Sequence, residues 1–355
     1  MQDHGLVFDC TKTAAKYNSK LLKKYGYDYG KLVAAHPNSV ISMGSEFRPI
    51  HQIEPLLHRH QDWNYIRAVL KEGGNYPMID DVPDPEQLRK NLIDMIDRGN
   101  HKSSSTKENK PVARKTIINE VCRAWSFPIT IETLLEIPEA MYVPVGIADQ
   151  IEVNENGEYV PKKRWIHDCS LSLPNGWSLN NLVDMSALPK CKYGHALLRY
   201  LYQTHIARCD HPNTIILQIK TDLDAAYRRM HAEPKIAIKQ VTLVDGIAYV
   251  ECRLPFGSSP APAIYCTTSD SLFDLANDLT RDPHWDPDDL SSSMKNSLPD
   301  PEIIDNAVPF APAKKLAVPV PSREIFIDGY VDDGVGACLH IKNNLKNFNT
   351  QSHLY

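Results

Sequence analysis

The stretch Glu324–Leu339 reads EIFIDGYVDDGVGACL, and it decides the fold that the sequence predicts. One apolar run leads into a polar turn and a second apolar run leaves it, which predicts two antiparallel strands in a hairpin. Asp332 and Asp333 fall at its tip, where they repel one another and have no cation beside them in the sequence. A bound divalent cation would relieve this repulsion, because hard cations prefer oxygen ligands. A solvated Asp-Gly turn is the alternative for this stretch taken alone.

A second acidic site follows a strand predicted over residues 214–223, where Asp222 and Asp224 lie close to the strand end. An aspartate in this position often caps the next helix, and Asp224 could do so while Asp222 points elsewhere. If Asp222 lies beside the hairpin tip, three acids converge. Such a cluster can hold two Mg²⁺ ions about 4 Å apart, the arrangement that supports in-line phosphoryl transfer.

Composition narrows the class of protein. The chain has 355 residues, of which 42% are hydrophobic, and a formal net charge of −5. These values are ordinary for a globular protein and do not by themselves indicate a nucleic-acid binder. The eight cysteines show no paired spacing, which is typical of free thiols in a reducing compartment. We therefore expect a soluble, intracellular chain with no membrane partner, while the choice between nucleus and cytoplasm stays open.

Four segments resemble, in the same order, the motifs of reverse transcriptases. Tyr330-Val331-Asp332-Asp333 resembles the Tyr-x-Asp-Asp signature, and residues 222–227 (DLDAAY) resemble the first catalytic motif, an Asp followed five positions later by an aromatic residue. Residues 253–265 resemble the middle motif in its Pro-Phe-Gly form, which is common in retrotransposons. Residues 164–168 and 176–180 resemble the preceding fingers motif. The ordered set covers about residues 161–341 and identifies the chain as a reverse transcriptase of retrotransposon type.

The resemblance implies a catalytic role for three aspartates. Asp222, Asp332 and Asp333 would bind two Mg²⁺ ions, or Mn²⁺ in their place, with Asp333 as the weaker contributor. The reaction implied is transfer of a deoxynucleotide to the 3′-hydroxyl of a primer, as in RNA-directed DNA polymerases. The implied partners are an RNA or DNA template with its primer and the deoxynucleoside triphosphates, and the sequence leaves protein partners undetermined.

The resemblance also implies a nucleotide site, made of Arg164, Tyr227, Phe256 and Gly257, with Tyr330 against the template–primer. Arg164 would grip the triphosphate with its forked donors. Tyr227 would lie under the sugar and exclude a 2′-hydroxyl. Each residue also has an ordinary interpretation on its own: a core aromatic for Tyr227, a surface charge for Arg164 and a turn for Pro255-Phe256-Gly257.

The chain departs from the family pattern at two points. His167 stands where the family usually has an apolar residue. Only residues 334–355 follow the aspartate pair, which is too few for the primer-gripping hairpin and the thumb, so we expect a chain truncated after Tyr-x-Asp-Asp. The alternative function is therefore a truncated or decayed retroelement remnant that is inactive and at most binds nucleic acid.

The expected fold is α+β: the fingers and palm of a right-hand polymerase without a thumb, with a palm sheet of the split β-α-β type backed by helices. We expect strands over 141–153 and 159–167 joined at Asn156-Gly157, and another strand over 235–244. The expected regions are an N-terminal helical extension over 1–118 with a basic linker at 99–114, fingers over 119–213, a palm over 214–342 with a proline- and acid-rich insertion at 281–322, and a tail over 343–355.

Overall fold

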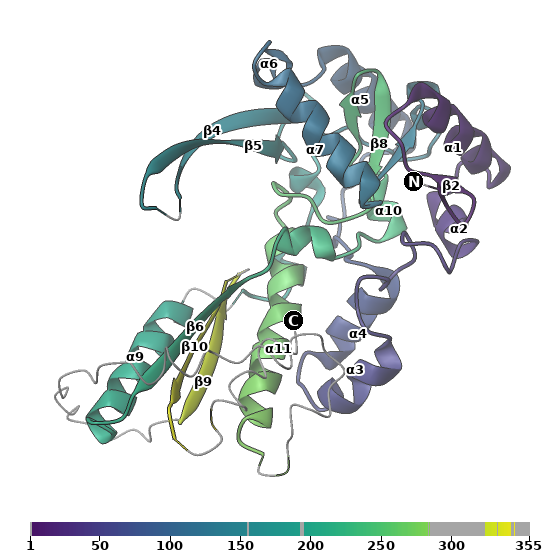
Figure 1. Ribbon diagram of the computed structural model, residues 1–355. Coiled ribbons are helices and arrows are strands. Elements are labelled where there is room, and N and C mark those ends of the chain that lie inside the picture. The colour runs from purple at the N-terminus through teal and green to yellow at the C-terminus, as the bar shows by residue number, and fades with distance from the viewer. Residues whose placement is uncertain are drawn as a thin grey trace. The chain divides into compact units, whose positions relative to one another are not determined.

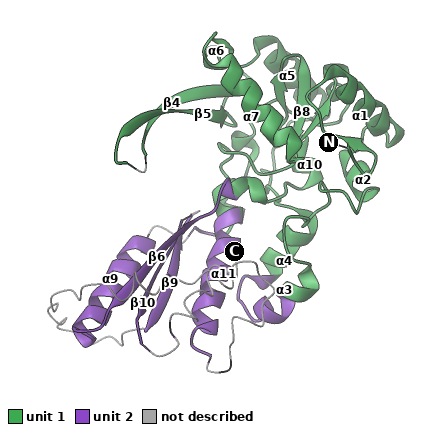
Figure 2. Ribbon diagram, in the orientation of Figure 1, with its two compact units in different colours: residues 1–53, 64–189, 227–264 green, residues 54–63, 190–226, 265–355 purple. Residues whose placement is uncertain are grey.

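The computed structural model describes residues 2–154, 156–191, 195–282, 284, 324–331, 333–341 and 344 (Figure 1). Within them the chain is mixed α+β with small antiparallel sheets, as the sequence predicted. It forms two compact units (Figure 2): unit 1 comprises Met1–Ile53, Asn64–Pro189 and Tyr227–Ile264, and unit 2 comprises Glu54–Trp63, Lys190–Ala226 and Tyr265–Tyr355. These units cross the boundaries that we expected near residues 118 and 213.

Unit 1 is built around a three-stranded antiparallel sheet in the order β3-β8-β7, formed by Ser126–Ile129, Ile247–Glu251 and Thr242–Val244. Every residue of β3 and β8 is buried, so these two strands form the centre of the core. Its other elements are β1 (Gln2–Asp3), β2 (Leu6–Val7), α1 (Lys12–Lys24), α2 (Tyr29–Ala34), α4 (Trp63–Glu72), α5 (Pro85–Arg98), α6 (Lys102–Ser105), α7 (Lys110–Cys122), α8 (Ile131–Leu134), β4 (Val145–Val153), β5 (Tyr159–His167), η1 (Asn180–Leu182), η2 (Met185–Ala187), η4 (Ala226–Arg229) and α10 (Pro234–Ala237).

The N-terminal residues belong to this core. Asn18 in α1 donates a hydrogen bond to the carbonyl of Pro128 in β3, at 3.0 Å, and Phe8 packs edge-on against Phe127 with ring centroids 5.9 Å apart. An aromatic pair in this geometry stabilises the packing by about 1 kcal/mol beyond the area that it buries. The residues expected to form an extension therefore pack against the central sheet of unit 1.

Two predicted segments differ in the structure. Residues 99–114 were expected to form a basic linker, but they contain α6 and the start of α7. Pro111 lies in the first turn of α7, where it is tolerated, and Ala113 and Ile117 of the same helix are buried. The expected strand over 235–244 begins instead as the short helix α10 after Pro234, and only Thr242–Val244 form strand β7.

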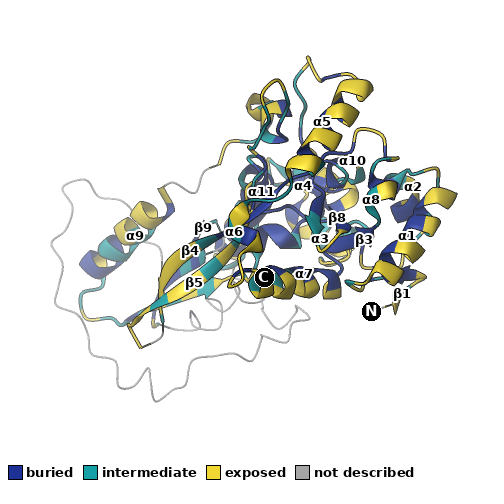
Figure 3. Cartoon of the chain, turned by 90° about the horizontal axis from the view of Figure 1, so that it is seen from above, coloured by how far each residue is buried: buried dark blue, intermediate teal, exposed yellow. Residues whose placement is uncertain are grey.

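The long hairpin of unit 1 agrees with the prediction. β4 and β5 pair from Val145↔His167 to Val153↔Tyr159, and the turn between them contains Gly157 at φ +79°. The turn requires this positive φ, which glycine adopts without steric cost, as expected for an Asn-Gly hairpin turn. The far end of the hairpin is largely exposed to solvent (Figure 3).

Unit 2 contains a sheet in the order β6-β10-β9, formed by Ile216–Asp222, Asp333–Leu339 and Ile325–Tyr330. β10 is antiparallel to both neighbours, so β6 and β9 are parallel and enclose it. The chain between β6 and β9 includes helix α11 (Ala261–Leu279). This is the split β-α-β connection that the sequence predicted. Among the described residues of this unit, the other helices are α9 (Ala196–Asp210) and the end of α3 (Ile50–Leu57).

The two faces of this sheet pack on different helices (Figure 1). One face buries Ile325, Ile327 and Cys338 with Phe273 and Ala276 of α11. The opposite face buries Ile216, Ala337 and Leu339 with Ala207 of α9. The sheet therefore lies between α9 and α11. The expected insertion at 281–322, except residues 281, 282 and 284, and the expected tail, except Asn344, lie outside the described residues. In the described part of the chain, no helix has the length and apolar character that a bilayer crossing requires.

Candidate functional site

Asp222 and Asp333 are direct partners across β6 and β10, although the chain between them is long. Directly opposed residues of an antiparallel pair project to the same side of the sheet, with Cβ atoms about 5 Å apart. The Asp222 residue is exposed and the Asp333 residue is half-buried. Asp332 lies outside the described residues. The structure therefore brings together two of the three acids that the sequence predicted to converge.

A cation that the sequence interpretation missed lies at this acid pair. Lys220 Nζ is 3.0 Å from Asp333 Oδ1, and 66% of the Lys220 side chain is exposed. Lys220 precedes Asp222 by two positions on β6 and so shares its face of the sheet. Neighbours in the sequence alone could not reveal it, because the contact depends on the register between two strands. An exposed pair of this kind stabilises the fold by at most about 1 kcal/mol.

The chemistry of these side chains fits a hard divalent cation. Two carboxylates from adjacent strands supply oxygen ligands, and Mg²⁺ is usually bound through one or two carboxylates while it keeps several water ligands. The ammonium of Lys220 lies at Asp333, so a metal ion would have to displace it from this carboxylate or share the carboxylate with it. Asp222 and Asp333 could therefore hold a metal ion.

The hairpin that carries Asp333 is fixed at its other strand. Asp328 in β9 accepts two hydrogen bonds from Arg199 in α9, from Nε at 2.6 Å and from Nη2 at 2.7 Å. This forked contact orients both side chains. Tyr330, the residue expected to contact the template–primer, is the Cα partner of Asp333 at the end of β9 and is 49% exposed. Arg199 had no recognisable signal in the sequence.

A side chain also forms hydrogen bonds with the edge of β9 that faces away from β10. The amide of Asn277 in α11 donates to the carbonyl oxygen of Ile327 at 2.6 Å and accepts from its backbone N–H at 3.0 Å. The amide thus takes the place of a neighbouring strand at this residue, which limits unwanted pairing along the edge. Gly329 lies against Phe273, where an added Cβ would be 1.8 Å from ring atom Cε2.

The predicted nucleotide-binding residues lie in unit 1, and two of them, Tyr227 and Phe256, are packed together. The rings of Tyr227 and Phe256 have centroids 4.9 Å apart and are tilted by 40°. Tyr227 is buried, whereas Phe256 is 47% exposed. Gly257 has φ +110°, and an added Cβ would lie 1.9 Å from the carbonyl oxygen of His167. The Phe256-Gly257 turn therefore needs glycine to pack against the end of β5.

Arg164, the fourth residue of this set, is exposed on β5 opposite Ala148 of β4. It projects from the opposite face of the hairpin to Trp165. Two further basic residues, Lys162 and Lys163, precede Arg164 on this strand. They form ion pairs across the hairpin with Glu152 and Asp149, each at 2.7 Å.

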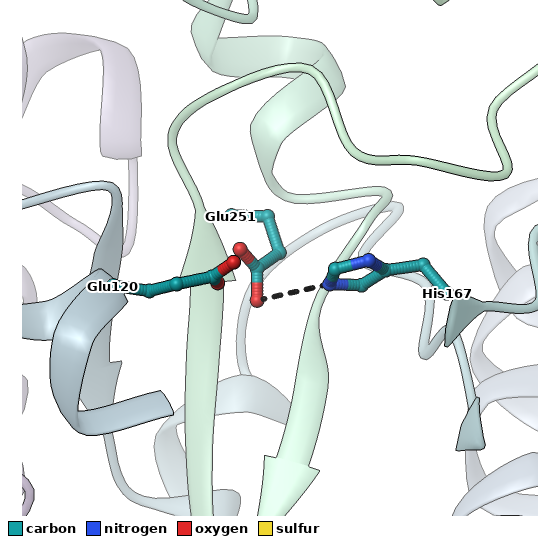
Figure 4. A group of neighbouring side chains, drawn as sticks. All are labelled: Glu120, His167 and Glu251. Carbon is teal, nitrogen blue, oxygen red and sulfur yellow. Dashed lines mark ion pairs between the residues drawn. The ribbon is translucent and has the colours of Figure 1, made fainter. Parts of the chain in front are cut away.

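A buried polar cluster in unit 1 was not predicted (Figure 4). It contains Glu120 from α7, Glu251 from β8 and His167 from β5, with ligand atoms within 4.8 Å of one another. Arg228 Nη2 lies 2.6 Å from Glu120 Oε2 and 2.7 Å from Glu251 Oε2. His167 Nε2 is 3.7 Å from Glu251 Oε1. In the sequence, His167 stands out only because reverse transcriptases usually have an apolar residue at the corresponding position.

The electrostatics of this cluster indicate a buried ion network. Burial by itself would raise the pKa of Glu251, but Arg228 and His167 outweigh it and lower that pKa to about 2. Burial raises the pKa of Glu120, and the neighbouring Glu251 carboxylate raises it as well. Burial also opposes the charge of Arg228, but the two carboxylates raise its pKa. The guanidinium thus supplies the positive charge that a metal ion would bring.

Comparisons with known proteins give only distant similarities. No protein-family model and no curated protein matches the sequence. Among solved structures, the chain is similar to native prototype foamy virus protease-reverse transcriptase, at 13% identity and a TM-score of 0.38, over 89% of this chain and 30% of that chain. It is also similar to the foamy viral protease-reverse transcriptase in complex with dsDNA, at 13% identity and a TM-score of 0.41, over 92% of this chain and 48% of that chain. The chain thus spans less than half the length of these proteins, and the roles proposed below rest on its own residues.

Proposed function

We propose that this chain is an RNA-directed DNA polymerase domain that adds deoxynucleotides to a primer 3′-hydroxyl. The observation that carries the proposal is the register of β6 and β10, which pairs Asp222 with Asp333. These two aspartates come from the two sequence motifs whose acids should bind metal in such an enzyme. The Pro255-Phe256-Gly257 turn supports an enzyme of the retrotransposon type.

In the proposed reaction the aspartates hold divalent ions on one face of the unit 2 sheet, with Asp332 completing the set. When bound, two Mg²⁺ ions would lower the pKa of the primer hydroxyl and neutralise charge on the pyrophosphate that leaves. Asp222 and Asp333 position these ions, because opposed strands fix the spacing of the two carboxylates. Tyr330, exposed beside Asp333, would contact the primer or template strand.

The sugar and base of the incoming nucleotide would bind against Tyr227 and Phe256. Tyr227 is held in a buried setting against Phe256, so its ring has little freedom to move away from a 2′-hydroxyl. A ring fixed in this way would select deoxynucleotides by steric exclusion. Arg164, exposed on β5, would bind the triphosphate. Tyr227 follows Asp222 by five positions, so the proposed sugar gate and metal ligand are close in the chain.

A second candidate function is nucleic-acid binding without incorporation. The observation that favours it is the contact of Lys220 with Asp333, at 3.0 Å, because an ammonium at this carboxylate competes with a metal ion. In a decayed domain this ion pair would persist and catalysis would be lost.

Primer extension separates the two candidates. Purified chain is incubated with a primed RNA or DNA template, the four deoxynucleotides and Mg²⁺ or Mn²⁺. A polymerase incorporates nucleotides, and Asp222→Asn lowers incorporation by at least about 100-fold, since even weaker perturbations of a metal site cost 10- to 100-fold. Asp94→Asn, at an exposed position of α5, is the matched control and should retain activity. Template binding without incorporation by the unaltered chain would favour the second candidate.

A further inference from the structure

The segments that carry all four proposed nucleotide-binding residues meet at the buried ion cluster of unit 1. His167 lies three positions after Arg164 and ends β5. Arg228 directly follows Tyr227 in η4. Glu251 ends β8, five positions before Phe256. His167, Arg228 and Glu251 therefore come from the three segments on which the proposed nucleotide site depends.

Glu251 is the centre of the cluster. Its side chain is completely buried, and its two oxygens accept from different donors. Oε2 accepts from Arg228 Nη2 at 2.7 Å, and the Ser126 hydroxyl lies 2.8 Å from it. Oε1 accepts from the Thr242 hydroxyl at 2.8 Å. A buried carboxylate with hydrogen-bond partners at both oxygens holds those partners in one geometry.

The same residues hold the backbone beside the Tyr227–Phe256 pair. Arg228 Nη1 donates to the carbonyl oxygen of Arg253 at 3.2 Å. Leu254 N–H donates to the carbonyl oxygen of Met230 at 3.0 Å. Segment 227–230 is thereby fixed beside segment 251–254, and the ring of Tyr227 meets that of Phe256 just beyond these bonds.

His167 links the hairpin to the same cluster. Its Nε2 atom lies 3.2 Å from the indole nitrogen of Trp165 and 3.7 Å from Glu251 Oε1. Its backbone carbonyl lies where only glycine fits at position 257. A shift of Glu251 would therefore displace His167 at the end of β5, and with it the Phe256-Gly257 turn.

We propose that Glu251 is a positioning residue for the nucleotide site: its carboxylate holds Arg228, and Arg228 holds Tyr227 against Phe256. This inference rests on the proposed polymerase function. Glu251 does not contact the nucleotide itself. Removal of the Glu251 carboxylate gives the ring of Tyr227 more freedom to move. Selection of the sugar and binding of the nucleotide then weaken more than the rate of the chemical step. Small displacements of binding groups can cost up to about 100-fold in rate.

The test compares Glu251→Gln with the unaltered chain in single-nucleotide extension with deoxy- and ribonucleoside triphosphates. The preference for deoxynucleotides should fall by about 10-fold or more, with a larger rise in KM than fall in kcat. Nucleotide binding, followed by quenching of tryptophan fluorescence, supplies a readout that does not depend on catalysis. Arg228→Lys, which keeps the charge but loses the fork, should show the same loss of sugar preference.

Lys239→Met is the matched control. It breaks another ion pair of unit 1, with Glu139 at 2.8 Å, and should lower the melting temperature without changing sugar preference. If Glu251→Gln does not fold, Glu251→Asp and Arg228→Lys carry the test. Unchanged sugar preference and KM in the folded variants would overturn the inference and leave the polymerase proposal intact. A wild-type chain that neither binds nor incorporates deoxynucleotides would instead overturn the proposed function.

Discussion

The acids of unit 1 and those of unit 2 differ in how their charges are balanced. Glu251 is fully buried, and Arg228, Ser126 and Thr242 occupy its oxygens. Asp222 is exposed, and Asp333 has an exposed lysine at one oxygen. Buried charges require fixed partners, because leaving one unpaired costs several kcal/mol, whereas exposed charges can exchange partners at little cost. The buried acids of unit 1 therefore stabilise the fold, whereas the exposed acids of unit 2 remain able to bind a ligand.

Removal of the buried cation should have the largest effect on stability. Arg228→Met would leave Glu120 and Glu251 buried side by side, and we expect the free energy of unfolding to fall by about 3–5 kcal/mol. Urea unfolding followed by circular dichroism measures this change. The exposed pair of Arg114 with Asp245 supplies the comparison, and Arg114→Met should change stability by less than about 1 kcal/mol. Equal losses in the two variants would remove the contrast between buried and exposed charges.

A backbone contact of the same buried region gives a smaller effect. Gly257→Ala places a Cβ 1.9 Å from the carbonyl oxygen of His167 at φ +110°, so the turn must shift. We expect a loss of about 2–3 kcal/mol and a weaker sugar preference, because Phe256 moves with the turn. Gly157→Ala is the matched control: its φ is +79°, but it has no atom within 4 Å of the added Cβ. It should cost about 1 kcal/mol. A Gly257→Ala protein as stable as this control would contradict the close packing.

The exposed site should show the smallest change in stability and a gain in binding. Lys220→Met removes the ammonium at Asp333, so we expect Mn²⁺ to bind a few-fold more tightly while stability changes by less than about 1 kcal/mol. Titration followed by Mn²⁺ electron paramagnetic resonance measures the affinity. Lys235→Met, which removes an exposed lysine paired with Glu233 at 3.1 Å, is the control. Weaker Mn²⁺ binding in Lys220→Met would indicate that the lysine supports the ion and does not compete with it.

Local patterns predicted the elements that carry the site. Helix α5 begins at Pro85, because the neighbouring residues Asp84 and Gln87 form a capping box, which is a local signal. The hairpin signals at Asn156-Gly157 and at residues 330–334 also led to paired strands. The basic run at 99–114 misled the interpretation, since its charge is visible in the sequence while the burial of Ala113 and Ile117 depends on partners elsewhere in the chain.

The sequence by itself determined the strand–turn–strand character of residues 324–339, the motif order and the candidate acids, because alternation, turn residues and spacing are local properties. Only the tertiary structure decided that Asp222 lies opposite Asp333, that Lys220 reaches this pair, and that Glu120, Arg228 and Glu251 share one buried network. Strand register and the pairing of buried charges join residues more than a hundred positions apart in several of these contacts. Such contacts follow from how the whole chain excludes water, so no short stretch of sequence encodes them.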